Sequence, residues 1–253
     1  MTIFTDKEAA LEELRSDRMP SAAESYLGGR IPSDALLWRK LLAAEAEARR
    51  KLGVPLEPTL ILPDEPTAAE LEALAGKPYI VEPGYDMDAD FFSQQSWGSL
   101  MLRVRPVIAI ESIRFVYPSM GATFFDVPDN WIRLDKKYGQ VQIVPGPGAS
   151  SAPISIFSLQ AVSSGSRVPH MIRARYTAGI DCNNPENFDV VDIIMQMAVL
   201  RVVQDSFTPQ SGSISADGLS QSVSADLGKL QEGLDDRLDA MKQKLMGVVW
   251  GVL

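Results

Sequence analysis

The stretch NFDVVDIIMQMAVLRVVQD, residues 187–205, decides how this chain folds. Its apolar residues fall on nearly every side of a helix; they are Phe188, Val190, Val191, Ile193, Ile194, Met197, Ala198, Leu200, Val202 and Val203. A helix that is apolar all round is usually central and packs against several neighbours. We therefore expect residues 187–205 to form the core helix of a mainly helical body.

The first quarter of the chain contains further helix signals. Segments 5–8, 21–24 and 67–70 each fit the capping box, in which a hydroxyl and a carboxylate bind free backbone N–H groups at a helix start. Residues 32–52 carry a helical apolar pattern that Gly53 ends. These signals predict helices on the N-terminal side of the core.

Between residues 100 and 177 the sequence becomes rich in Val, Ile, Phe, Tyr and Arg, broken by Pro and Gly. Strands are predicted at about 101–105, 108–117, 122–127, 131–134, 140–144, 154–160 and 170–177. In WIRLDKKYGQVQIV, residues 131–144, two β-prone runs flank a loop whose Gly139 is free to take positive φ. This pattern predicts a hairpin within a small antiparallel β insertion.

The predicted fold class is α+β, with a mainly helical core, an inserted small antiparallel β domain and an extended C-terminal tail ending in an amphipathic helix. The predicted parts are 1–99, helical with an acidic linker; 100–180, the β-rich insertion; 181–207, the central core helix; and 208–253, a Ser/Gly connector with the final helix.

The final helix carries a narrow apolar seam among mixed charges. The seam residues are Leu227, Leu230, Leu234, Leu238, Met241 and Leu245, and the chain continues with Val249, Trp250, Val252 and Leu253. A mixed-charge helix with such a seam requires a partner along it. We expect this tail to bind another molecule.

Charge is concentrated in one segment. The 253 residues include 33 acidic and 24 basic side chains, a formal net charge of −9, which argues against a broad basic face for nucleic acid. Residues 57–90 hold nine carboxylates and one lysine, a net charge of −8. This composition is typical of a solvated, proline-punctuated connection. A fixed negative surface that meets a partner or a passing polyanion is the alternative.

Few residues could support catalysis. The lone Cys182 rules out an intrachain disulfide, and the lone His170 removes most zinc-catalytic ligand sets. No run approaches the length of a membrane span, and the first residues lack the pattern of a signal peptide. We expect a soluble protein without enzymatic activity, with no catalytic residues, metal, cofactor or membrane partner.

The run Asp86-x-Asp88-x-Asp90 resembles the start of a calcium loop. An EF-hand loop, however, requires Gly at its sixth position and Glu at its twelfth, where this chain has Phe91 and Trp97. A solvated acidic loop is therefore favoured over a metal site.

The β-rich region is locally basic, and Arg133, Lys136 and Lys137 lie in or beside its predicted hairpin loop. The other basic residues counted there are Arg103, Arg105, Arg114, Arg173 and Arg175. Such residues usually form the wet face of a half-buried sheet, and an interface with an acidic neighbour is the second interpretation.

Three stretches together carry a family resemblance: RPVIAIESIRFVYPSMG (105–121), VPDNWIRLDKKYGQVQIVPGPG (127–148) and ISADGLSQSVSADLGKLQEGLDDRL (214–238). They resemble the head–tail connector (adaptor or neck) proteins of tailed bacteriophages, over roughly residues 100–240.

The resemblance implies a structural protein of the virion neck, made in the bacterial host cytoplasm. It implies a ring, usually twelve-fold, that joins the capsid portal to the tail. The implied partners are the portal protein, further copies of the chain, a downstream neck or tail-completion protein, and genomic DNA that passes without tight binding. The seam residues and the apolar terminus correspond to the portal-binding segment, and Asp86, Asp88 and Asp90 are candidates for an acidic channel lining.

Two alternatives stay open at the level of sequence. One is a tail-completion or baseplate protein that also forms a ring. The other is a metal-dependent enzyme that uses Asp86, Asp88 and Asp90. For the leading hypothesis, we expect deletion of residues 226–253 to abolish portal attachment and leave the folded core intact.

Overall fold

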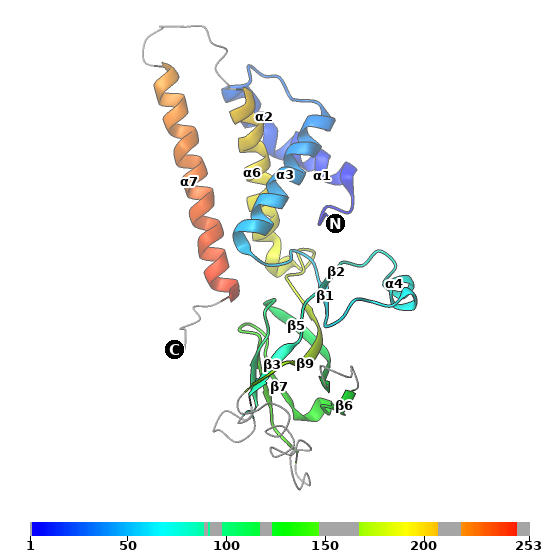
Figure 1. The fold of residues 1–253 in the computed structure, drawn as a ribbon. Helices are drawn as coiled ribbons and strands as arrows, with labels where there is room; N and C mark the ends of the chain where they lie inside the picture. Colours follow the sequence, from blue (N-terminus) through cyan, green and yellow to red (C-terminus); the bar gives the residue numbers. More distant parts are fainter. Residues whose placement is uncertain are drawn as a thin grey trace. The chain divides into compact units, whose positions relative to one another are not determined.

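The computed structural model describes residues 2–88, 91, 98–116, 123–146, 167–206 and 219–246 (Figure 1). The chain divides into two compact units. Met1–Leu56 and Asp181–Lys244 form the helical unit, and the β unit is built on Glu57–Ile180. The protein is therefore α+β, as predicted, with the β unit inserted between two helical segments of the chain.

The helical unit is assembled around one helix. It contains α1 (Lys7–Glu13), a π-helical turn (Leu14–Arg18), α2 (Met19–Tyr26), α3 (Asp34–Leu52), a 3₁₀ turn (Pro185–Asn187), α6 (Phe188–Ser206) and α7 (Leu219–Met246). Helix α6 packs most extensively against α3 and also contacts α2 and the π turn. Its buried residues surround the helix axis: Val190, Ile193, Ile194, Met195, Met197, Ala198, Leu200, Val202 and Val203. Helix α6 therefore packs against several neighbours of the helical unit.

Two of the predicted helix starts are wrong. The N-cap of α1 is Asp6, whose carboxylate accepts a hydrogen bond from the Ala9 N–H at 3.0 Å, so Thr5 does not cap this helix. Ser21 lies inside α2, because the chain stays helical through the π turn that joins α1 to α2. Leu14 and Met19 are both fully buried, and this packing favours a continuous helical path over a break.

The β unit contains two sheets. The strands are β1 (Thr59–Leu62), β2 (Tyr79–Val81), β3 (Tyr85–Asp88), β4 (Ser99–Met101), β5 (Val107–Val116), β6 (Thr123–Asp126), β7 (Ile132–Asp135), β8 (Gln140–Ile143) and β9 (Arg167–Ala178). The larger sheet has the order β2-β1-β9-β5-β6, with β3 also paired to β9. The smaller sheet has the order β4-β8-β7. Only β1 and β2 run parallel among the described pairs.

Strand β9 organises the larger sheet, since it pairs with β1, β3 and β5. Tyr176 of β9 and Phe115 of β5 are completely buried in the core of this unit. The smaller sheet contributes Val141 and Ile143 to the same core. A single apolar core therefore holds both sheets together.

Three strands lie in the segment that the sequence predicts to be an acidic connection. Strands β1, β2 and β3, together with α4 (Ala68–Leu74), occupy much of residues 57–90. The apolar runs of β1 and β2 are only three or four residues long and stand between prolines, so they show no alternation for a pattern to detect. The β unit thus begins near Glu57, whereas the sequence places its start at residue 100.

Two local predictions in the β unit are confirmed. Strands β7 and β8 form a hairpin, and Gly139 in its turn has a φ of +63°. Helix α4 starts with a capping box in which Thr67 Oγ1 accepts from the Glu70 N–H and Glu70 accepts from the Thr67 N–H at 3.0 Å. The strand expected at 154–160 and most of the Ser/Gly connector lie outside the described residues.

Candidate functional site

The apolar seam of α7 has a partner within the same chain. Leu227, Leu234, Leu238 and Met241 are buried, and Leu238 is only 1% exposed. Leu230 is 52% exposed, and Leu245 is half-buried. The remaining predicted portal-binding residues, Val249, Trp250, Val252 and Leu253, lie outside the described residues. The sequence predicted an unpartnered seam, but most of it packs in the helical unit.

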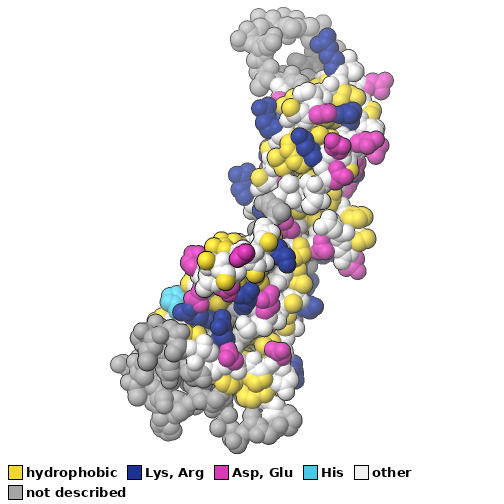
Figure 2. All heavy atoms as spheres, turned by 90° about the vertical axis from the view of Figure 1, so that its right-hand side faces the viewer, with side chains coloured by type: hydrophobic (Ala, Val, Ile, Leu, Met, Phe, Trp, Pro, Cys, Tyr) yellow, Lys and Arg dark blue, Asp and Glu magenta, His cyan; other side chains and the backbone are white. Residues whose placement is uncertain are grey.

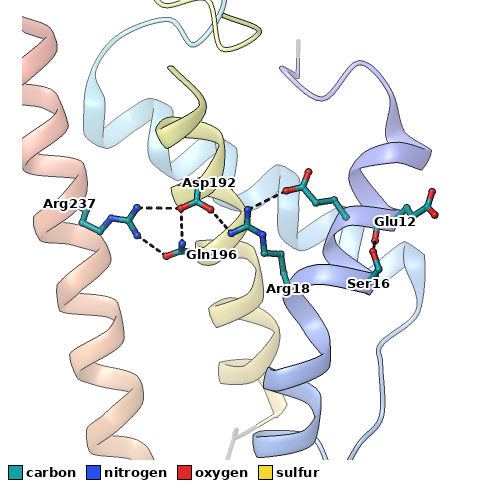
Figure 3. Close-up of polar contacts among 7 residues, drawn as sticks. Glu12, Ser16, Arg18, Asp192, Gln196 and Arg237 are labelled. Carbon is teal, nitrogen blue, oxygen red and sulfur yellow. Dashed lines mark hydrogen bonds and ion pairs between the residues drawn. The ribbon is translucent and has the colours of Figure 1, made fainter. Parts of the chain in front are cut away.

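A polar network next to the seam joins three helices (Figure 3). Asp192 of α6 accepts hydrogen bonds from Arg18, at the end of the π turn, and from Arg237 of α7, the latter at 3.3 Å. Gln196 bridges the pair, because it donates to Asp192 at 2.7 Å and accepts from Arg237 at 2.8 Å. Arg18 also reaches Glu13 at 3.3 Å. The hydrogen bond from Arg18 to Asp192 raises the pKa of the guanidinium, against the opposing effect of burial.

A second polar contact holds the opposite flank of α7. Lys51 of α3 donates to Asp235 of α7 at 2.5 Å and to Glu47 at 3.0 Å. Arg201 of α6 pairs with the same Glu47. Burial alone would lower the pKa of Lys51, but its hydrogen bonds to Asp235 and Glu47 raise it overall. Helix α7 is therefore fixed by an apolar seam with ion pairs on both sides.

Sequence reasoning did not identify these polar residues, because the partners lie far apart in the chain. Arg18 and Asp192 are separated by 174 residues, and Lys51 and Asp235 by 184. The charges of α7 were visible in the sequence, yet nothing local indicated which of them face the helical unit. The only local signal was the narrowness of the seam itself.

Four of the nine acidic residues of segment 57–90 pair with arginines of β9. Arg173 pairs with Asp64, and Arg175 bridges Glu70 at 3.0 Å and Glu111 at 2.7 Å. On the face drawn in Figure 2, basic and acidic side chains are interspersed. The sequence left open an interface between the basic β residues and an acidic neighbour. For Arg173 and Arg175, the acidic partners lie within the β unit itself.

Asp86 and Asp88, two of the candidate channel-lining residues, also pair with an arginine of β9. Arg167 donates to Asp88 at 2.8 Å and lies 3.9 Å from Asp86, whose carboxylate also accepts from the His170 N–H at 3.1 Å. Asp90 lies outside the described residues. Asp86 and Asp88 are thus brought together at the end of β3, with an arginine between them and part of their charge compensated.

The predicted β-domain interface residues lie at the β7–β8 hairpin. Arg133, Lys136 and Lys137 are exposed there. Arg133 donates to the backbone carbonyl of Asn130 at 2.7 Å, and Lys137 lies over the Tyr138 ring at 5.7 Å. The hairpin therefore presents two cations, Lys136 and Lys137, in its turn and a third, Arg133, on β7.

Metal-ligating residues do not gather in the described part of the chain. No group of three or more His, Cys, Asp or Glu residues is placed there to hold a metal ion. His170 is exposed, with its Nδ1 2.9 Å from the Gly84 carbonyl oxygen, and Cys182 is buried. Across the same residues, no helix is long and apolar enough to cross a membrane.

Comparisons with known proteins give a distant structural likeness. No protein-family model matches the chain, and no curated protein matches it either. The solved structures similar to it include a chain from the neck of an empty gene transfer agent particle, at 15% identity, and a chain from the virion of a native gene transfer agent particle, at 17%. In both cases 84% of this chain and 82% of the other are covered, with a TM-score of 0.37. At this identity and TM-score, the likeness assigns neither family nor function.

Proposed function

We propose that this chain is a structural component of a phage-like particle, where copies of it form a ring at the neck. The ring joins the capsid portal to the tail and leaves a passage for DNA. The proposal rests on how α7 is packed. The helix packs along the helical unit through a buried seam that ends at Met241, whereas the apolar sequence continues to residue 253. The three stretches that resemble phage connector proteins support the same conclusion.

The portal contact is assigned to the end of α7 and the segment beyond it. Leu227, Leu234 and Leu238 are already buried within the chain, so binding the portal through them would first require separating α7 from α6. Leu245 is half-buried, and the apolar residues of 247–253 follow it. We therefore place the attachment there, with the seam serving to anchor α7.

A short apolar tail favours attachment in many copies. Burying one large apolar side chain contributes about 1.5–3 kcal/mol, whereas ordering each residue costs about 1–2 kcal/mol in backbone entropy. One tail would therefore bind weakly. Several tails tethered to one ring would bind strongly, since each bound tail raises the effective concentration of the next.

The DNA passage is compatible with the charge distribution. Asp86, Asp88 and Asp90 remain the candidates for an acidic lining, with Arg167 compensating part of the charge of the first two. A lining of mixed sign with a net negative charge would neither hold the phosphates nor form a continuous repulsive wall. DNA would then pass without being retained.

The test is deletion of residues 247–253 from the full chain, followed by copurification with the portal protein of the same particle. We expect portal binding to be lost while thermal unfolding of the protein stays unchanged. The matched control is Gln243→Ala, which alters an exposed polar residue of α7 outside the proposed contacts and should leave portal binding intact. Portal binding at the unmodified level after the deletion would refute the assignment. Deleting 226–253 is a poorer test than the sequence indicated, because it also removes the buried seam.

A further inference from the structure

A groove in the helical unit is lined in a way that suits an acidic, apolar partner. It has a volume of about 400 Å³ and runs between α2 and α7 over α6. Val199, Leu200 and Val203 of α6 line it together with Tyr26 of α2. Its charged lining residues are Arg18, Lys229 and Arg237, and no carboxylate lines it among the side chains that the structure describes. Arg18 and Arg237 share Asp192, whereas Lys229 has no ion pair among the described residues.

On the α7 side, the groove is bordered by an exposed leucine and by a glycine. Leu230 borders it and is 52% exposed. Gly233 also borders it, and a Cβ added at that position would meet nothing within 4 Å. Glycine inside a helix costs about 1 kcal/mol relative to alanine, so its presence here is not explained by the stability of α7. A missing side chain at the rim would instead allow another element to approach closely.

The β unit carries a projection of matching chemistry. Helix α4 lies apart from the strands in Figure 1, with Leu71 46% exposed on it. Its capping box and the bond from Arg175 to Glu70 at 3.0 Å hold it in place. Glu65 and Glu72 are exposed beside it and have no ion pair within the described part of the chain. An apolar side chain with uncompensated carboxylates next to it is thus presented on a fixed helix.

We propose that α4 of one copy docks in the groove of a second copy, with Leu71 against the apolar residues of α6 and Glu72 directed to Lys229. The contact is heterologous, since it joins two different surfaces. Repetition of a heterologous contact gives a closed ring when the rotation closes. The inference rests on the proposed function in identifying the partner as another copy in the neck ring, but it does not depend on portal binding.

The test uses two variants of the full chain that each add one cysteine, Leu71→Cys and Leu230→Cys, mixed and treated with a short bismaleimide linker. Both positions are exposed, so both variants should fold, and the native Cys182 is buried. We expect the mixed dimer to form at about ten times the yield of a control pair in which Met101→Cys, 42% exposed on β4, replaces Leu71→Cys. Equal yields from the two pairs would overturn the proposal.

A charge exchange gives an independent measure. Glu72→Lys and Lys229→Glu should each weaken self-association, measured by sedimentation equilibrium, by about tenfold or less, and the two variants mixed should recover it. Recovery would identify the pair as facing each other, and failure of the mixture to recover would refute this pairing. Absence of both preferential cross-linking and recovery, with portal binding still lost on deletion of 247–253, would show that only the contact between copies is wrong. Loss of portal binding on deletion of 247–253 is measured separately.

Discussion

At the scale of residues, a buried carboxylate joins three parts of the β unit. Oε1 of Glu82 accepts hydrogen bonds from the hydroxyls of Tyr85 on β3 and Tyr176 on β9, at 2.5 and 3.0 Å. The two hydroxyls in turn accept from the backbone N–H groups of Arg103 and Val104. The segment after β4 is therefore held to both strands through one acidic side chain. Hydrogen bonds of this kind lower the cost of burying a charged group.

This cluster predicts a loss of stability at high pH. Burial, followed by the hydrogen bond to Glu82, raises the pKa of Tyr85 to about 12, and burial also raises the pKa of Tyr176. Above pH 10 the unfolded tyrosines lose their protons first, so the unfolded state binds fewer protons than the folded state. The free energy of unfolding should therefore fall between about pH 10 and 12, by at most about 1.4 kcal/mol per pH unit for each tyrosine.

The measurement is urea unfolding from pH 7 to pH 11.5 for the natural protein and for Tyr85→Phe. At neutral pH the variant should be about 2 kcal/mol less stable, since the carboxylate of Glu82 loses a hydrogen bond. Above pH 10 its stability should fall less steeply. An identical slope in both proteins would show that Tyr85 does not titrate with a raised pKa.

The number of charged residues could be read from the sequence, but their pairing could not. Nine carboxylates in segment 57–90 could be counted, and the arginines of β9 could be read as alternating. Their pairing could not, because Arg173 and Asp64 are 109 residues apart. Glu82 was counted as one more surface charge, although it is buried against tyrosines that only the sheet brings together.

At the scale of elements, the two sides of α7 have different environments. The side that carries Leu238 packs against the helical unit, while Leu230 borders the open groove. Leu238→Ala should lower the free energy of unfolding by about 2–4 kcal/mol, because it leaves a cavity in a packed seam. Leu230→Ala should change it by less than about 0.5 kcal/mol. Chemical denaturation of both variants measures the difference, and equal effects would mean that the seam is not seated as described.

Long, strongly periodic elements could be predicted from sequence, and short ones could not. The pattern of 187–205 was sufficient for α6, and Gly53 with the 32–52 pattern for α3. The π turn at Leu14–Arg18 and the short β1 and β2 depend on tertiary packing, so local pattern gave no indication of them. The seam of α7 was predicted, but its partner was not. An apolar stripe indicates that a helix face is buried, but it does not identify the element that covers it.

At the scale of the whole molecule, each unit carries one part of the proposed assembly. The helical unit carries the groove and anchors the arm that is proposed to reach the portal. The β unit carries the α4 projection and the cationic hairpin with Arg133, Lys136 and Lys137. Both halves of the proposed contact between copies lie on one chain, which is the requirement for a ring built from identical subunits.

Electron microscopy of particles that carry this protein with a small density label on its N-terminus tests the central claim most directly. We expect label density arranged as a ring at the neck, between the portal and the tail. Label on the baseplate, along the tail or nowhere on the particle would contradict it.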